Sequence, residues 1–416
     1  MSGPAPRPTA SGAALRVGFT PIGGAQWTGG RTWQLNLLRA TCRYESARVR
    51  PVVFCGIDLA ASEVEQFAAI PGVELVRAAA FDAGNSRRRL ARSLLIGRDR
   101  EAVEAFLHHE IDVAFESAVF YGWRCPLPVI AWLPDFQHRH MPEQFSIRAR
   151  WKREIGFRAQ VASGRIVMVS SEDARKDCEH FYLRSAGRTA VVRFAAPIDD
   201  SLFESDPLAT ARAYGLPRTF IYLPNQFWKH KDHATAIDAV AILRDRGIVV
   251  TIAASGNPVD PRHPEHYAAL RARVEALGIP DRFRFLGMIP RPHLVSLLRT
   301  CAALINPSLF EGWSSTVEES RSLGVPLLLS DIRVHREQMG DTAIYFDPAN
   351  PVALADAIEK TIQHPAAPAT PRLPGTGSDV NVRRFAADFA SVVECAAGKV
   401  QAKASDARGK HEAARA

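Results

Sequence analysis

The sequence predicts an α/β protein built from two Rossmann-like, doubly wound parallel-sheet domains. Its 416 residues exceed what one hydrophobic core usually supports, so two domains are expected. In both halves, short apolar runs alternate with segments of helical periodicity, which is typical of parallel strands joined by crossover helices. Between the halves, residues 197–218 carry acids and prolines without a long apolar run, as an interdomain linker does.

The first domain is expected over residues 14–196. Its predicted strands are 15–19, 52–55, 73–76, 113–115, 128–132, 166–169 and 191–194, and its predicted helices are 63–69, 87–108, 148–162 and 172–182, with another starting near Trp33. Ser171 stands where it can cap the helix that follows it. Such a sheet binds its ligands at the carboxyl ends of its strands.

The second domain is expected over residues 219–377. Its predicted strands are 220–223, 248–253, 282–288, 302–305 and 327–329, and its predicted helices are 234–243, 264–277, 294–299 and 352–362. Residues 378–398, with Phe385, Phe389 and Val393 at helical spacing, predict a C-terminal helix. The ends of the chain, residues 1–13 and 399–416, have biased compositions and are expected to be disordered.

The composition disfavours several classes of protein. The apolar runs have only strand length, so no transmembrane helix is expected, and the first residues lack the pattern of a signal peptide. A cytoplasmic protein is therefore expected, with peripheral contact at the inner membrane face as an extension. The 6 cysteines are scattered, which predicts neither disulfides nor a zinc site. No Asp-x-Asp motif is present, so no metal is expected in the site.

Positive charge is concentrated in the first half of the chain. Residues 1–195 contain 27 Lys and Arg against 19 Asp and Glu, whereas residues 196–416 contain 25 of each kind. A basic half of this type suits an anionic membrane or a phosphate-linked acceptor, and the alternative is a solvated face without a partner. Nucleic acid is not an expected partner, because no basic motif interleaved with aromatic residues occurs.

The most informative stretch is residues 302–320. Its apolar start predicts a buried strand, and the turn after that strand carries Glu311 and Gly312. Two overlapping Ser/Thr-x-x-Glu sequences within 315–319 have the capping-box spacing of a helix start. A strand, a turn and a helix start in this order present amide N–H groups and a positive dipole end to an anion, so a phosphate site is predicted here.

Two carboxylates flank this predicted anion site, Glu311 in the turn and Glu319 in the first helical turn. They cannot hold phosphates, because like charges repel. They can accept hydrogen bonds from the hydroxyl groups of a sugar and a ribose, which favours a nucleotide-linked sugar as the ligand. The alternative interpretation is that both are ordinary acids at a helix start.

This stretch resembles the donor site of the retaining glycosyltransferases of family 4, which have the GT-B fold. The resemblance rests on Glu311 and Glu319 with the segments 322–326 and 330–337, and it continues through 340–348. It implies two Rossmann-like domains that face a cleft and a C-terminal helix that crosses back to the first domain. It also implies transfer with retention of configuration, no cofactor, and a nucleoside diphosphate sugar as co-substrate.

The resemblance also assigns roles in donor binding. Glu311 would hold the sugar and offset positive charge on its ring, Glu319 would bind the ribose, and the backbone of Met288 and Ile289 would hold the base. A glycine-rich loop after the first strand would face the diphosphate; the alternative is a flexible surface loop. The further residues expected at the donor are Gly29, Gly30, Asn225, Gln226, Gly256, Gly312, Trp313, Ser314, Ser315 and Thr316.

A cationic turn follows the first strand of the second domain. Lys229 and Lys231 lie two residues apart and could meet phosphates as point charges. Members of the family usually carry an Arg and a Lys in this turn. Lys231 matches the Lys, whereas Gln226 stands at the Arg position, so Lys229 is expected to supply the second charge.

Residues 133–143 follow a strand of the first domain, where the acceptor is expected. Many members of the family carry a His-Asp pair here, but this chain has Pro134-Asp135. Asp135 could orient or deprotonate the attacking hydroxyl. His138 could do the same at neutral pH or contact the donor phosphate, and His140 is a third candidate. The alternative is that these are surface residues without a role.

The sequence thus predicts a metal-independent retaining transferase that moves a hexose, such as mannose, to a hydroxyl of a glycan or lipid-linked acceptor. Polysaccharide or lipopolysaccharide synthesis is the expected context. A nucleotide-sugar epimerase and a catalytically silent nucleotide-sugar binder are the two alternatives. The base, the sugar and the acceptor stay open at this point.

Overall fold

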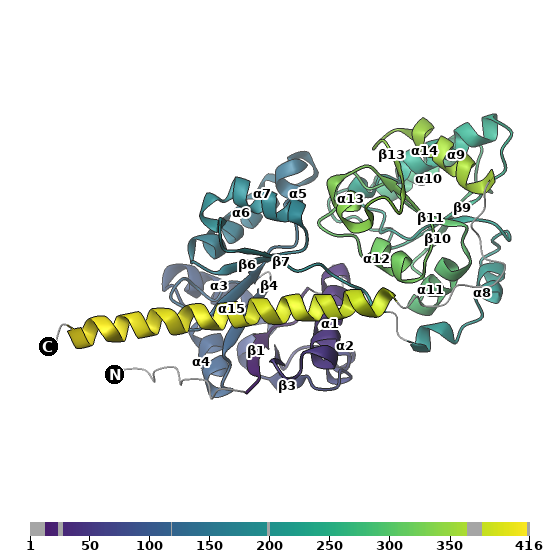
Figure 1. The fold of residues 1–416 in the computed structure, drawn as a ribbon. Helices are drawn as coiled ribbons and strands as arrows, with labels where there is room; N and C mark the ends of the chain where they lie inside the picture. Colours follow the sequence, from purple (N-terminus) through teal and green to yellow (C-terminus); the bar gives the residue numbers. More distant parts are fainter. Residues whose placement is uncertain (1–12, 24–27, 118, 198–199, 364–376, 414–416) are drawn as a thin grey trace.

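The computed structural model describes residues 13–23, 28–117, 119–197, 200–363 and 377–413, organised around two parallel sheets (Figure 1). The N-terminal sheet has seven strands in the order β3-β2-β1-β4-β5-β6-β7. They are β1 (Leu15–Phe19), β2 (Val49–Cys55), β3 (Glu74–Arg77), β4 (Val113–Ser117), β5 (Val129–Trp132), β6 (Ile166–Val169) and β7 (Thr189–Val191). All of its pairings are parallel.

The C-terminal sheet has six strands in the order β10-β9-β8-β11-β12-β13, again all parallel. They are β8 (Ile221–Leu223), β9 (Ile252–Ser255), β10 (Phe283–Gly287), β11 (Ala303–Asn306), β12 (Leu327–Ser330) and β13 (Ile344–Phe346). The predicted fold class is therefore confirmed. Strand β13 was not predicted, because a strand of three residues at a sheet edge leaves too short an apolar run to recognise.

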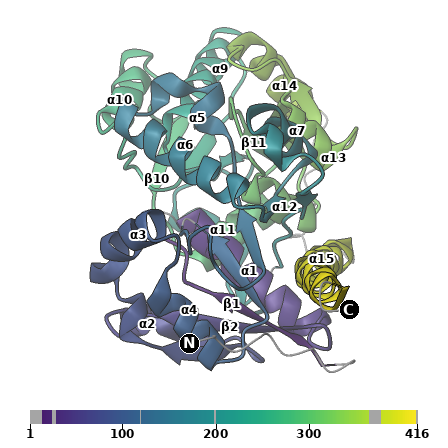
Figure 2. The ribbon, with the colours of Figure 1, turned by 90° about the vertical axis from the view of Figure 1, so that its left-hand side faces the viewer.

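Helices connect the strands of each sheet. Those of the N-terminal domain are α1 (Thr28–Tyr44), α2 (Ala61–Ala68), α3 (Ser86–Leu95), α4 (Arg100–His108), α5 (Gln137–His140), α6 (Ile147–Ala162) and α7 (Glu172–Phe181). Those of the C-terminal domain are α8 (Pro207–Ala213), α9 (His233–Asp245), α10 (His266–Ala276), α11 (Arg291–Thr300), α12 (Ser315–Ser322), α13 (Arg333–Met339) and α14 (Pro351–Gln363). Figure 2 views the molecule with the N-terminal domain nearer to the reader.

One predicted helix is divided in the structure, and one predicted cap is confirmed. Residues 87–108 form two helices, because Gly97 has a φ of +79° and Asp99 then caps α4 by accepting from the amide of Ala102 at 3.3 Å. Ser171 caps α7 as predicted, with its Oγ accepting from the amide of Ala174 at 3.0 Å.

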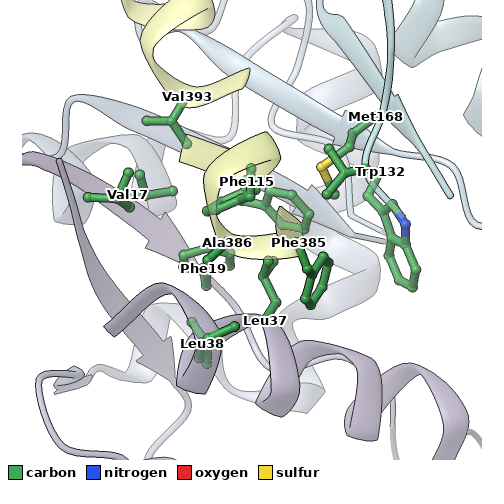
Figure 3. Close-up of a cluster of buried hydrophobic side chains, with 14 of the residues drawn as sticks. Val17, Phe19, Leu37, Leu38, Phe115, Trp132, Met168, Phe385, Ala386 and Val393 are labelled. Carbon is green, nitrogen blue, oxygen red and sulfur yellow. The ribbon is translucent and has the colours of Figure 1, made fainter. Parts of the chain in front are cut away.

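The C-terminal helix α15 (Gly377–Ala413) crosses back over the N-terminal domain (Figure 1), which confirms that prediction. Its apolar face completes the core of this domain (Figure 3). The ring of Phe389 lies 6.0 Å from the rings of both Phe19 and Phe115, and Phe385 lies 5.7 Å from Phe194. The hydrophobic core of the first domain is therefore completed by the last helix of the described chain.

The ends and the linker differ from the expectations. The helix α15 continues to Ala413, although disorder was predicted from residue 399; alanine, lysine and arginine favour helix there. Residues 1–12 of the segment with predicted disorder lie outside the described part. In the predicted linker, α8 packs on the C-terminal domain, where Ala211 and Leu216 join its core. Among the described helices, none is both long and apolar enough to span a bilayer.

Truncation of Phe385 tests the role of α15. Phe385→Ala should lower the free energy of unfolding of the N-terminal domain by about 3–5 kcal/mol, because a buried ring is replaced by a cavity. Urea unfolding followed by tryptophan fluorescence measures this loss. Val380→Ala, at an exposed position of the same helix, is the control and should change little. Equal midpoints for the two variants would show that α15 does not stabilise the domain.

Candidate active site

A cavity of about 360 Å³ lies between the two domains, at the carboxyl ends of strands from both sheets. Asp135 lines it from the N-terminal domain. The predicted donor residues that line it are Gly29, Gly30, Asn225, Gln226, Lys231, Gly256, Met288, Ile289, Glu311, Gly312, Trp313, Ser314, Ser315, Thr316 and Glu319. The structure thus brings together residues that the sequence scatters over seven loops and helix starts, and it leaves His138 and Lys229 outside the cavity lining.

An ion pair joins the two turns that the sequence singled out. Nζ of Lys231 donates to Oε1 of Glu311 at 2.5 Å, and both side chains are largely buried. Burial by itself would raise the pKa of Glu311, but the charges of Lys231 and His335 and the hydrogen bonds from Lys231 and Ser308 together outweigh it and hold that pKa below the ordinary value. The backbone adds a second link, because the amide of Leu309 donates to the carbonyl of His230 at 2.8 Å. Glu311 is therefore a buried carboxylate.

The helix start next to Glu311 differs in detail from the prediction. Helix α12 begins at Ser315, and the predicted capping boxes are not formed. The side chain of Ser314, the N-cap residue, makes no capping hydrogen bond and instead accepts from Nδ2 of Asn306 at 2.9 Å. The two glutamates of the predicted capping boxes, Glu318 and Glu319, accept hydrogen bonds from other side chains instead. The capping side chain therefore does not occupy the first-turn amides, which suits the predicted anion site.

A buried amide network fixes this helix start against the cationic turn. Nδ2 of Asn225 donates to Oδ1 of Asn306 at 3.1 Å, and Oγ1 of Thr316 donates to Oδ1 of Asn225 at 3.3 Å. Asn306 in turn holds Ser314, as described above. Because each amide is bonded to residues of other turns, the distance between Lys231 and the start of α12 is set by these contacts.

Gly256 allows the neighbouring loop to approach this network. A Cβ atom at this position would lie 2.2 Å from the carbonyl oxygen of Asn225, and the φ of +154° is one that residues with a side chain rarely adopt. Its amide donates to the carbonyl of Gly287 at 2.9 Å. The loop after β9 therefore needs glycine here to reach the cavity.

Glu319 is held by an arginine that the sequence did not single out. Nη1 of Arg291 donates to Oε1 of Glu319 at 2.8 Å, and both residues line the cavity. Arg291 opens α11, two residues after Ile289. A basic residue directly after the predicted base-binding loop was the available signal.

Lys229, expected to supply the second charge, lies outside the lining of the cavity. Lys229–Lys231 form a 3-10 turn, in which successive residues are about 120° apart, so the two lysines point in different directions. Lys231 faces the cavity, whereas Lys229 is exposed. Between them His230 lines the cavity, and burial followed by the charge of Lys231 lowers the pKa of His230 well below its ordinary value. His230 is therefore neutral at neutral pH.

Asp135 lies on the N-terminal wall as predicted, but it is already bonded. Its Oδ1 accepts from the amide of Gln137 at 3.0 Å and from Nη1 of Arg153 at 3.0 Å. Beside it, the stacked rings of Trp33 and Trp132, with centroids 3.8 Å apart, also line the cavity. The sequence did not identify these tryptophans, because they come from different elements.

The role predicted for His138 is not supported by its position. The short helix α5 turns its side chain into the N-terminal core, where Nε2 lies 3.4 Å from Oε2 of Glu154 and 3.5 Å from the hydroxyl of Tyr182. Burial lowers the pKa of His138. His140 is bonded to Asp177 at 2.6 Å, and its ring lies 5.4 Å from that of Phe310.

The two domains touch at the site itself. A Cβ atom on Gly312 would lie 2.4 Å from the carbonyl oxygen of Pro134 and 3.0 Å from Cβ of Asp135, so the turn that carries Glu311 packs directly on the opposite wall. Next to it, Nε1 of Trp313 donates to the carbonyl of Phe194 at 2.9 Å. Within the described ranges, no group of three or more potential metal-ligating side chains occurs.

A salt-bridged contact reinforces this closed arrangement farther from the cavity. The carboxylate of Glu337, on α13, accepts from the amide of Glu172 at 2.9 Å and from Nε of Arg193 at 2.9 Å. Its negative charge lies at the start of α7, where the helix dipole favours it. The second domain thus supplies an anion to a helix terminus of the first.

Comparison with known proteins identifies a family match in the second domain. Residues 213–372 match the family Glycosyl transferases group 1. The D-inositol 3-phosphate glycosyltransferase of Corynebacterium glutamicum is 25% identical over 215 residues, which are 50% of this chain and 51% of that protein. The O-antigen chain mannosyltransferase B of Escherichia coli is 30% identical over 80 residues, which are 19% of this chain and 21% of that protein. These matches span about half or less of the length of the curated relatives.

Solved structures resemble nearly the whole chain. Anabaena Alr3699/HepE in complex with UDP and glucose has a TM-score of 0.61 at 16% identity, covering 94% of this chain and 100% of that one. A glycosyltransferase from Rickettsia africae has a TM-score of 0.61 at 13% identity, covering 92% and 94%. WaaG, a glycosyltransferase involved in lipopolysaccharide biosynthesis, has a TM-score of 0.55 at 14% identity, covering 92% and 98%. The chain therefore has the GT-B fold.

Gly312→Ala tests the contact between the domains. The added methyl group would meet the carbonyl of Pro134, so we expect the domains to separate, with a strain of about 1–3 kcal/mol in the closed form. Small-angle X-ray scattering should show a larger radius of gyration than for the unchanged protein. Gly156→Ala, where a Cβ atom has no neighbour within 4 Å, is the control. An unchanged radius for Gly312→Ala would contradict the prediction.

Glu318 predicts a pH dependence of stability. Burial raises the pKa of Glu318 from 4.5 to about 7. The contribution of Glu318 to the free energy of unfolding is therefore complete below about pH 4.5 and is lost as the pH rises through about 7. Glu318→Gln resembles the protonated carboxyl at every pH. We expect the variant to be more stable than the original at about pH 8, by up to about 3 kcal/mol, and equally stable at about pH 4.5.

Thermal unfolding at both pH values measures this difference. Because other groups titrate equally in the two proteins, the difference between them isolates residue 318. A constant difference across the range would show that Glu318 titrates normally.

Proposed function

We propose that this protein is a retaining, metal-independent glycosyltransferase that moves a hexose from a nucleoside diphosphate sugar to a hydroxyl of a glycan or lipid-linked acceptor. The observation that carries the proposal is the meeting of Lys231, Glu311 and the start of α12 in one cavity between two Rossmann-like domains. The family match over residues 213–372 and the GT-B fold support glycosyl transfer. Retention, metal independence and the kind of donor are part of this proposal.

The donor diphosphate is proposed to lie between Lys231 and the amides of Ser315 and Thr316. Both partners line the cavity, and together they present one full positive charge and the positive end of a helix dipole. As the bond to the sugar breaks, negative charge grows on the leaving diphosphate. Little reorganisation is needed to stabilise that charge, because hydrogen bonds through Asn225 already hold the start of α12 and the ion pair with Glu311 already holds Lys231.

Glu311 is proposed to act on the sugar. As a buried carboxylate it can accept hydrogen bonds from the sugar hydroxyls and offset the positive charge that develops on the ring. When the diphosphate binds, Lys231 lies between the carboxylate of Glu311 and the diphosphate and can interact with both. Glu319, held by Arg291 at 2.8 Å, is placed to accept from the ribose hydroxyls, beside the loop of Met288 and Ile289 that would receive the base.

The acceptor is proposed to enter along the N-terminal wall. Both hydrogen bonds given to Asp135 use its Oδ1, so Oδ2 is the atom we assign to the attacking hydroxyl. The hydrogen bond from Arg153 holds the carboxylate of Asp135 in place, which favours its role in orienting the nucleophile or taking its proton. The flat rings of Trp33 and Trp132 suit the apolar face of a sugar.

Polysaccharide or lipopolysaccharide synthesis is the proposed context. Two of the similar proteins are named for O-antigen synthesis, and WaaG for lipopolysaccharide biosynthesis. The net positive charge of the first domain suits an acceptor that carries phosphate or sits in an anionic membrane. Mannose is the first hexose to test, because one of these relatives is a mannosyltransferase.

A donor panel tests the function. The protein is incubated with UDP-, GDP- and dTDP-sugars, with and without glycan or lipid-linked acceptors, and release of nucleoside diphosphate is measured. Release that requires an acceptor supports transfer, and NMR of the product then gives the anomeric configuration. Isomerised sugar would instead indicate an epimerase, and binding without turnover a silent binder. Undiminished turnover in EDTA is expected for a reaction without a metal ion.

The two lysines of the cationic turn provide a matched pair of variants. Lys231→Ala should lower kcat/KM by about a hundredfold or more, because a charge that faces the leaving diphosphate is lost. Lys229→Ala should leave kcat/KM nearly unchanged, because Lys229 is exposed and lies outside the cavity lining. Thermal unfolding identifies any loss caused by leaving Glu311 unpaired. Equal effects of the two substitutions would contradict the proposed phosphate site.

A further inference from the structure

Helix α6 carries an apolar stripe on its outer face. Ile147, Trp151 and Ile155 follow one another at four-residue spacing, so their side chains lie on one side of the helix. They are 75%, 57% and 53% exposed, respectively. The inner face of α6, through residues such as Phe157 and Val161, already packs on the domain core. The stripe is therefore not needed to hold the helix in place, and water covers three large apolar side chains.

Cations surround this stripe. Arg148, Arg150 and Lys152 are exposed, and in the described part of the chain no carboxylate lies within salt-bridge distance of them. The two other cations of the helix are bonded, Arg153 to Asp135 and Arg158 to Glu154. An exposed apolar face with tryptophan, bordered by unpaired arginine and lysine, is the pattern of a helix that lies in a membrane interface.

The N-terminal domain carries a second group of exposed apolar residues. Leu95 and Ile96, at the end of α3, are 84% and 63% exposed, and Trp123 is 48% exposed. The loop of Trp123 joins both helices: Nε2 of Gln160, on α6, donates to the carbonyl of Val119 at 3.1 Å, and the amide of Arg124 donates to the carbonyl of Gly97 at 2.8 Å. In Figure 2, α3 and α6 both lie on the near side of the molecule.

We propose that these six residues form a docking face that binds peripherally to an anionic lipid bilayer. We use this name for Ile147, Trp151, Ile155, Leu95, Ile96 and Trp123. Their side chains would enter the interface while the cations around them meet lipid phosphates. A second copy of the chain fits this face less well, because a two-fold contact would place the same unpaired cations against each other. The excess positive charge of residues 1–195 also favours binding to an anionic bilayer.

The docking face lies close to the acceptor wall of the cavity. Arg153, on the inner side of α6, bonds to Asp135, so a single helix separates the stripe from the cavity. The diameter of a helix with its side chains is about 10–12 Å. An acceptor sugar held on a membrane lipid could therefore reach Asp135 while its lipid stays in the bilayer. This reading of the acceptor rests on the proposed function, whereas vesicle binding does not.

Vesicle binding of the full chain tests the proposal. Flotation is measured with vesicles of phosphatidylcholine alone and with vesicles that contain one third phosphatidylglycerol. The triple variant Ile147→Ser, Trp151→Ser, Ile155→Ser should bind the anionic vesicles at least about tenfold more weakly. Arg148→Gln with Lys152→Gln should weaken binding by roughly fivefold for each lost charge, and added salt should act in the same direction. Val249→Ser with Val352→Ser, at exposed sites of the C-terminal domain, is the control.

The outcomes separate the alternatives. Binding that needs phosphatidylglycerol and is lost in the triple variant, but not in the control, supports the docking face. Equal binding by the triple variant, or none by the unchanged protein, would overturn it. A dimer in sedimentation velocity that the triple variant dissolves would show an interface between copies and would also overturn it. Turnover with a soluble acceptor is measured in parallel: its absence contradicts the proposed function and leaves the docking result unaffected.

Discussion

Two opposite charges, Nζ of Lys231 and the carboxylate of Glu311, lie 2.5 Å apart in a largely buried cavity, and the arrangement of the site depends on this pair. Burying either charge alone would cost several kcal/mol, so the pair is stable only while both turns hold their places. The backbone bond from Leu309 and the Asn225–Asn306 contact hold those turns. On the proposed function, the pair makes the position of the carboxylate that faces the sugar depend on the position of the cation that binds the phosphate.

The site also requires that the two domains meet. The turn of Glu311 reaches the opposite wall because Gly312 has no side chain to collide with Pro134, and Trp313 and Glu337 add hydrogen bonds across the same boundary. These direct contacts are mostly polar, as in interfaces that open and close. Parting of the domains would expose the cavity to a ligand, and closure would remove water from the reacting groups.

The two domains differ in charge and, on our proposals, in task. The neutral C-terminal domain supplies the cations and amides for the donor, whereas the basic N-terminal domain supplies Asp135 and the docking face. Helix α6 connects the two functions of the first domain, since one side of it holds Asp135 and the other carries exposed apolar residues. A transferase of this form would work at the surface where a lipid-linked acceptor is found.

The sequence by itself determined the two parallel sheets, the presence of a C-terminal helix, and the turns that carry Glu311 and Lys231. Each of these follows from a local pattern of apolar spacing or from a motif in one segment. Only the tertiary structure decided that Lys231 faces the cavity while Lys229 does not, and that His138 is buried in the core. It also revealed the Arg291–Glu319 pair. These features depend on the direction of single side chains and on contacts between distant elements, which local patterns do not specify.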